Sequence, residues 1–80
     1  MSAEERDMGE QPLARLMSER GLTPKDLVGS SPDQITHKMV ARAMKGRRLT
    51  KNTMDKVHRA WNVASGEERP RAELFNYKPL

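Results

Sequence analysis

Helix start and stop signals divide this 80-residue chain into short segments. Three glycines suit the position just after a helix: Gly21, Gly46 and Gly66. Three threonines suit the N-cap position at the start of a helix: Thr23, Thr36 and Thr50. Between these signals apolar residues recur at three- and four-residue spacing, as one face of a helix requires. No alternating pattern typical of a β-strand appears. The sequence therefore predicts an all-α fold, a small bundle of four to five short helices.

The first two helices are expected on either side of Gly21. The first begins at Pro12, where apolar residues start to recur, and it ends before Gly21. The second follows Thr23, whose hydroxyl forms a capping pattern with the carboxylate of Asp26 three residues later. This second helix is short and is expected to end near Gly29.

Two starting points fit the third helix. The run Ser31-Pro32-Asp33-Gln34 is itself a capping-box pattern, and Thr36 is a second N-cap. We interpret residues 31–35 as a turn, with one helical turn as the alternative. The main helix is then expected to run from Thr36 or His37 to Lys45.

The fourth helix carries the one tryptophan of the chain. Either Thr50 or Asn52 can cap it. Met54, Val57 and Trp61 then keep the 3.6-residue period on one face. We therefore interpret Trp61 as a core anchor rather than as a platform for base stacking.

The two ends of the chain differ from this helical domain, which is expected at 11–66. Residues 1–10 hold four acids and no sustained apolar period, so a flexible N-terminal tail is expected. The C-terminal tail, residues 67–80, carries two of the three aromatic residues, Phe75 and Tyr77. We expect this tail to pack on the bundle, with a partner subunit as the alternative.

Composition excludes several classes of function. The chain has no cysteine and two histidines twenty-one residues apart, so no metal site or cofactor is predicted. It lacks a glycine-rich phosphate loop, a serine elbow and paired carboxylates, so we expect no enzyme and no small-molecule substrate. No secretory signal and no long apolar run appear. A cytoplasmic protein that does not enter a membrane is therefore expected.

Basic residues concentrate in one part of the chain. Residues 37–59 hold eight of them against one acid, Asp55, which gives a local net charge of +7 within a chain of net charge +4. Residues 1–36 carry a net charge of −3, and residues 60–80 are neutral. A basic segment with helix signals on both sides of a glycine is typical of a footprint for a polyanion, most commonly DNA.

These cations fall into two groups of candidate phosphate contacts. The first group surrounds the turn at Gly46, where side chains can follow a phosphate backbone: Lys45, Arg47, Arg48 and Lys51. The second group, Lys56 and Arg59, lies three residues apart on the fourth helix and is expected to extend the patch outward, with His58 beside it.

The order of these elements resembles the lambda-repressor-like, or Cro-type, helix-turn-helix domain across about Pro12 to Gly66. The resemblance is carried by Arg-Gly-Leu-Thr at 20–23 and by Thr-His-Lys-Met-Val-Ala-Arg-Ala-Met-Lys-Gly-Arg-Arg at 36–48. The segment 53–63 looks like the fourth helix of that family. Thr-His-Lys-Met-Val-Ala-Arg-Ala, Lys-Gly-Arg-Arg-Leu-Thr and Leu-Phe-Asn-Tyr together also look like a group of small uncharacterised bacterial proteins.

The resemblance implies a small transcriptional regulator that binds double-stranded DNA with its third helix. Carried over by position, it implies that His37, Lys38 and Arg42 face base edges. Arginine and lysine can donate to guanine O6 and N7, and histidine can donate or accept. Thr36 would cap the helix and contact a phosphate. Specific binding by one such module implies a homodimer on two half-sites.

One departure from the family favours a second hypothesis. From Leu27 to Thr36 the chain is about two residues longer than the family spacing, and the usual Ala-x-x-x-Gly is missing. The alternative function is a protein-interaction module that docks an acidic protein partner through the same basic surface.

Overall fold

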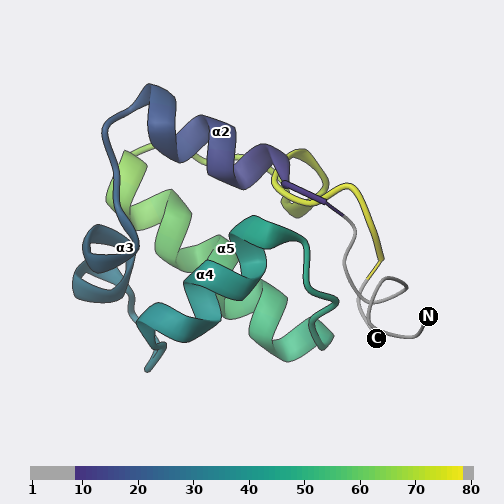
Figure 1. The fold of residues 1–80 in the computed structure, drawn as a ribbon. Coiled ribbons are helices and arrows are strands. Elements are labelled where there is room, and N and C mark those ends of the chain that lie inside the picture. Colours follow the sequence, from purple (N-terminus) through teal and green to yellow (C-terminus); the bar gives the residue numbers. More distant parts are fainter. Residues whose placement is uncertain (1–8, 79–80) are drawn as a thin grey trace.

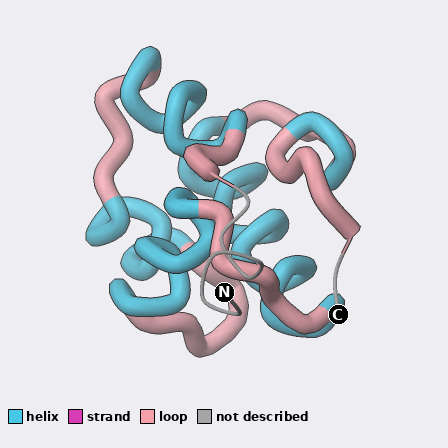
Figure 2. Tube along the Cα trace, turned by 45° about the vertical axis from the view of Figure 1, so that its right-hand side comes forward, coloured by secondary structure: helices cyan, strands magenta, loops and turns pink. Residues whose placement is uncertain are grey.

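The computed structural model describes residues 9–78, and their regular structure is helical (Figure 1). The elements are α2 (Pro12–Glu19), α3 (Pro24–Ser30), α4 (His37–Lys45), α5 (Lys51–Ser65) and a 3-10 turn, η1 (Arg71–Glu73). No strand occurs between residues 9 and 78, and Figure 2 shows helices and loops alone from a second direction. The predicted all-α bundle is confirmed.

The longest helix, α5, is the element on which the others assemble. Helices α3 and α4 both contact α5, and α4 also contacts α2 and α3. In Figure 1, α4 lies in front of α5 and α2 crosses above them. Helix α4 therefore has one side on the bundle and one side towards solvent.

Side-chain caps set the beginnings of the helices. Thr23 Oγ1 accepts from the Asp26 amide (3.3 Å) while Asp26 Oδ2 accepts from the Thr23 amide (2.8 Å), which completes the predicted capping box. Thr36 Oγ1 accepts a hydrogen bond from the Met39 amide (3.1 Å) and so caps α4. Thr50 Oγ1 accepts from the Thr53 amide (3.3 Å), so Thr50 rather than Asn52 caps α5.

The end of α3 and the start of α4 show which of the two expected starting points for the third helix is correct. Residues 31–36 are not helical, and the Ser31 hydroxyl accepts from the Asp33 amide (3.0 Å) in a turn. The turn interpretation is therefore confirmed, and α4 begins at His37. Helix α3 ends at Ser30, one residue beyond Gly29, so the expected end near Gly29 is confirmed.

The core gathers apolar residues from every helix and from the C-terminal segment. Its fully buried side chains include Leu13, Leu27, Val40, Met54 and Trp61. The predicted role of Trp61 as a core anchor is confirmed, because its side chain is 0% exposed and cannot stack on a base.

The C-terminal segment lies on the bundle of its own chain. Leu74 is fully buried, and its carbonyl accepts from the Leu13 amide (3.0 Å). Phe75 is also buried and meets Tyr77 edge to face, with the ring centroids 5.9 Å apart. Of the two expected arrangements, packing on the bundle or on a partner subunit, the structure has the first.

Gly46 ends α4 in a place where a side chain has no room. Its φ is +87°, in the left-handed region, and a Cβ built there would overlap the carbonyl oxygen of Gly9. We expect Gly46→Ala to lower the free energy of unfolding by about 1–3 kcal/mol, from the backbone strain and this overlap together. Urea denaturation followed by circular dichroism measures the change.

Gly21→Ala is the matched control for this prediction. Gly21 also has a positive φ, +66°, but a Cβ there meets nothing within 4 Å. Gly21→Ala should therefore introduce the backbone strain alone, and it should lower the free energy of unfolding by less than Gly46→Ala does. Equal losses of stability in the two variants would contradict the claim that Gly9 packs against Gly46.

Candidate nucleic-acid interface

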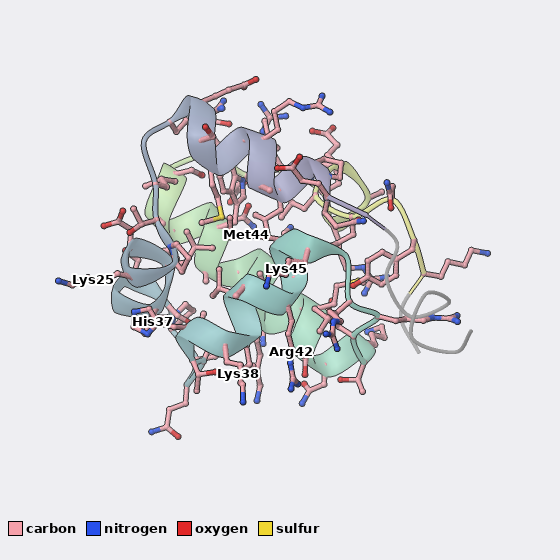
Figure 3. The ribbon with its side chains drawn as sticks, in the orientation of Figure 1. Lys25, His37, Lys38, Arg42, Met44 and Lys45 are labelled. Atoms are coloured by element: carbon pink, nitrogen blue, oxygen red, sulfur yellow. The ribbon has the colours of Figure 1, made fainter. Side chains whose placement is uncertain are left out.

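Helix α4 presents a stripe of cations opposite its buried side. The cap at Thr36 fixes the start of the helix, and Val40 and Ala43 turn inward to the core. Exposed Lys38, Arg42 and Lys45 follow one another at four- and three-residue spacing. Residues at this spacing share one face of a helix. Figure 3 shows these three side chains along α4.

His37 begins this face, and Lys25 is a further exposed cation on the preceding helix, α3. His37 is exposed at the first position of α4. Lys25, exposed in the first turn of α3, is drawn at the same end of the bundle in Figure 3. Lys25 lies in the segment whose net charge is −3, so charge along the sequence did not single it out. Its position directly after a capped helix start was the available signal.

A basic turn continues the stripe beyond the end of α4. The left-handed conformation of Gly46 lets the amides of Gly46 and Arg47 both donate to the carbonyl of Arg42, the latter at 3.0 Å. This closes the helix and brings Arg47 beside Arg42. Arg47 and Arg48 are both exposed.

Two shallow hollows adjoin at this turn. One, of about 220 Å³, is lined by Lys38, Ala41, Arg42, Lys45 and Arg47. The other, of about 250 Å³, is lined by Arg42, Arg47, Arg48 and Leu49. Arg42 and Arg47 line both of them. The hollows therefore place several guanidinium and ammonium donors around one region of the surface, an arrangement that suits phosphate oxygens.

We call this surface the basic face and define it as Lys38, Arg42, Lys45, Arg47 and Arg48. Within residues 9–78, no ion pair involves any of these five side chains. Their charges are therefore not neutralised by acids among the described residues, although like charges this close repel one another. A polyanion would relieve that repulsion.

Five acids among residues 9–78 are instead paired with cations outside the basic face: Glu19, Asp33, Asp55, Glu67 and Glu73. Asp33 Oδ2 accepts from Arg59 Nε (2.7 Å), and this bond holds the pKa of Asp33 below its ordinary value. Burial by itself would raise the pKa of Asp55, but hydrogen bonds from Lys51 and Arg71 outweigh burial and lower it. These carboxylates therefore stay ionised and engaged at neutral pH.

The three candidate phosphate contacts on α5 have different surroundings from the basic face. Lys51 Nζ lies 3.2 Å from Asp55, although its side chain is 70% exposed. Arg59 forms an ion pair with Asp33, so its charge is offset by that of a carboxylate. Lys56 is half-buried and forms no ion pair among residues 9–78.

The expectation that His58 joins the outward patch is wrong. His58 is half-buried, and its Nε2 contacts the carbonyl oxygen of Arg69, in the segment that follows α5. The sequence contained no sign of this contact, because Arg69 lies eleven residues further along the chain.

The link between α3 and α4 is longer than an ordinary helix-turn-helix turn. Six residues separate Ser30 from His37. The usual turn of this motif has about three to four residues. The extra length noted in the sequence therefore lies in this link, and the two helices still contact one another.

Comparison with known proteins adds no family. No protein-family model, curated protein or solved structure matches this chain. The resemblance to the Cro-type domain therefore stays an expectation based on the residues quoted above. Within residues 9–78, no group of three or more metal-ligating side chains is placed to hold a metal ion. None of the helices in that range is long and apolar enough to cross a membrane.

Proposed function

We propose that this protein binds double-stranded DNA through α4 and the basic turn that follows it. The observation that carries the proposal is the basic face, which groups five cations without an acidic partner among residues 9–78. Binding that neutralises phosphates with such side chains releases counterions and is favourable. The protein would act in the cytoplasm as a small transcriptional regulator.

The proposed contacts divide between the two ends of α4. Arg47, Arg48 and Lys45 contact the phosphate backbone, while His37, Lys38 and Arg42 face base edges in the major groove. Thr36 Oγ1 already accepts the cap hydrogen bond from Met39, which leaves its own hydrogen for a phosphate oxygen.

The remaining phosphate candidates, Lys51, Lys56 and Arg59, would contact DNA further along α5. Lys51 and Arg59 would first have to exchange a carboxylate for a phosphate. We therefore assign the larger part of the binding free energy to the basic face and a smaller part to these three residues.

Specific binding by this domain would use a homodimer on two half-sites. Phe75 is buried in its own bundle and Tyr77 is half-buried against it, so they offer limited surface for self-association. Among residues 9–78, Val63 on α5 is the large apolar side chain left exposed, at 56%. Contacts between two copies should be sought first around Val63.

The six-residue link between α3 and α4 favours one rival function. A longer link changes how far α4 projects beyond α3, and major-groove docking depends on that projection. The rival is a protein-interaction module whose basic face docks an acidic protein. It predicts weak duplex binding without sequence preference, together with tight binding of an acidic partner.

Salt dependence tests the proposal. If about five phosphates are neutralised, the logarithm of the association constant should fall with the logarithm of salt at a slope of about −4 to −5. Fluorescence anisotropy of a labelled mixed-sequence duplex, between about 50 and about 200 mM salt, measures this slope. Absence of binding at the lowest salt would contradict the proposal.

A further inference from the structure

The segment that carries Tyr77 touches the basic turn from across the sequence. The Tyr77 hydroxyl donates to the carbonyl oxygen of Arg47 at 2.7 Å, although thirty residues separate the two. Burial raises the pKa of Tyr77, while a backbone hydrogen bond with Leu49 and the charge of Arg48 oppose the rise. The Tyr77 hydroxyl therefore lies against the backbone of the basic turn, with the Arg47 carbonyl as its hydrogen-bond acceptor.

The backbone of Arg47 is held at both of its polar groups. Its amide donates to the carbonyl of Arg42 at the end of α4 (3.0 Å), and its carbonyl accepts from Tyr77. With both groups engaged, the peptide between Arg47 and Arg48 has little freedom to rotate. Since a side chain leaves the backbone in a direction that φ and ψ set, this peptide directs both guanidinium groups.

Tyr77 is itself held rigidly enough to act as a support. Its ring packs edge to face on Phe75, which is 3% exposed. The Asn76 amide donates to Gln11 Oε1 (2.8 Å), and Gln11 is 1% exposed. The backbone amide of Gln11 in turn donates to the Met44 carbonyl in the last turn of α4 (3.0 Å). The C-terminal segment and the end of α4 are thus tied together at two places.

We propose that Tyr77 is a positioning residue for the basic face, which fixes the Arg47–Arg48 peptide so that both arginines are preorganised for phosphate. The inference rests on the proposed function. Tyr77 touches no phosphate itself. Its hydroxyl acts by lowering the conformational freedom that the turn would otherwise lose on binding, and such preorganisation strengthens binding without adding a contact.

Tyr77→Phe in the full chain tests this role, because it keeps the ring and its contact with Phe75 and removes the hydroxyl alone. We expect duplex affinity at low salt to fall about three- to tenfold, the effect of losing one well-placed hydrogen bond. The charges are unchanged, so the salt slope should stay the same. Amide NMR of the free protein should show the largest shifts and faster hydrogen exchange at Arg48 and Leu49.

Ser65→Ala is the control for a merely structural effect. The Ser65 hydroxyl accepts from the Glu67 amide (3.1 Å) at the end of α5, so this variant also loses one local hydrogen bond. We expect it to leave duplex affinity and the signals of Arg48 and Leu49 unchanged. An equal loss of affinity in Ser65→Ala would overturn the positioning role.

The remaining outcomes separate the inference from the proposed function. If the natural chain binds duplex DNA and Tyr77→Phe binds equally well with unchanged Arg48 and Leu49 signals, Tyr77 does not position the turn. If the natural chain does not bind duplex DNA at low salt, the proposed function fails, and this inference fails with it.

Discussion

Replacing both Arg47 and Arg48 by glutamate is expected to weaken duplex DNA binding by about 100-fold or more at low salt. Each arginine should make a charge-assisted contact of at least about 1.4 kcal/mol, and each such contact is about a factor of ten in affinity. The introduced carboxylates would also repel phosphates. The salt slope should become less steep by about two, from about −4 to −5 towards about −2 to −3, because two fewer counterions are released. Fluorescence anisotropy across a salt series measures both quantities.

A single charge reversal on another helix provides the matched control. Arg15 is exposed on α2 and has no ion pair among residues 9–78. Arg15→Glu therefore changes the net charge of the protein as much as Arg48→Glu does. We expect Arg48→Glu to weaken binding about tenfold or more and Arg15→Glu to have a much smaller effect. Equal effects would mean that net charge, and not the basic face, drives binding.

Trp61→Ala is expected to have the largest effect on stability. The Trp61 side chain is 0% exposed, and the Arg20 guanidinium carbon lies 5.6 Å from its ring centroid. Truncating a buried tryptophan costs about 3–5 kcal/mol. A domain of this length has a total free energy of unfolding of roughly 4–12 kcal/mol. The variant should therefore lose between about a quarter and all of its free energy of unfolding, which urea denaturation measures.

Two further variants calibrate that result. The Trp61 indole N–H has no hydrogen-bond partner among the described residues, so Trp61→Phe loses volume but no hydrogen bond and should cost less. Val63 lies on the same helix and is 56% exposed, so Val63→Ala should change stability by less than about 0.5 kcal/mol. A Trp61→Ala variant that loses no more stability than Val63→Ala would contradict the burial of Trp61.

The helix ends could be predicted because their signals are local. The Thr36 hydroxyl and the Met39 amide are three residues apart, and the stop at Gly46 depends on the conformation of one residue. Local hydrogen bonds and backbone preferences of this kind leave a pattern in the sequence itself. The same holds for Trp61, because helical spacing from Met54 and Val57 placed it on the buried side.

The partners of the basic residues could not be predicted in this way. Arg59 and Asp33 are twenty-six residues apart, and Tyr77 and Arg47 are thirty apart. Contacts between distant residues depend on how helices pack, and net charge along the sequence does not reveal them. The sequence therefore indicated where cations concentrate but could not separate Arg59, which is paired with an acid, from Arg42 or Arg48.

The local charge along the sequence does not distinguish cations that lie against acids from cations that do not. The sequence suggested one patch from the third helix to the end of the basic segment. In the structure Lys51 and Arg59 lie against acids and His58 contacts the backbone, so Lys56 is the one lysine or arginine of α5 without an ion pair among residues 9–78, whereas all five cations of the basic face lack one. This narrower surface is what the proposed function relies on.

The most direct test of DNA binding is a backbone amide NMR titration of the natural chain with mixed-sequence duplex DNA, at low and at physiological salt. We predict shifts concentrated at residues 36–48 that weaken steeply as salt rises. Spectra that do not move even at low salt would contradict DNA binding. The basic face should then be tested as a docking surface for an acidic protein.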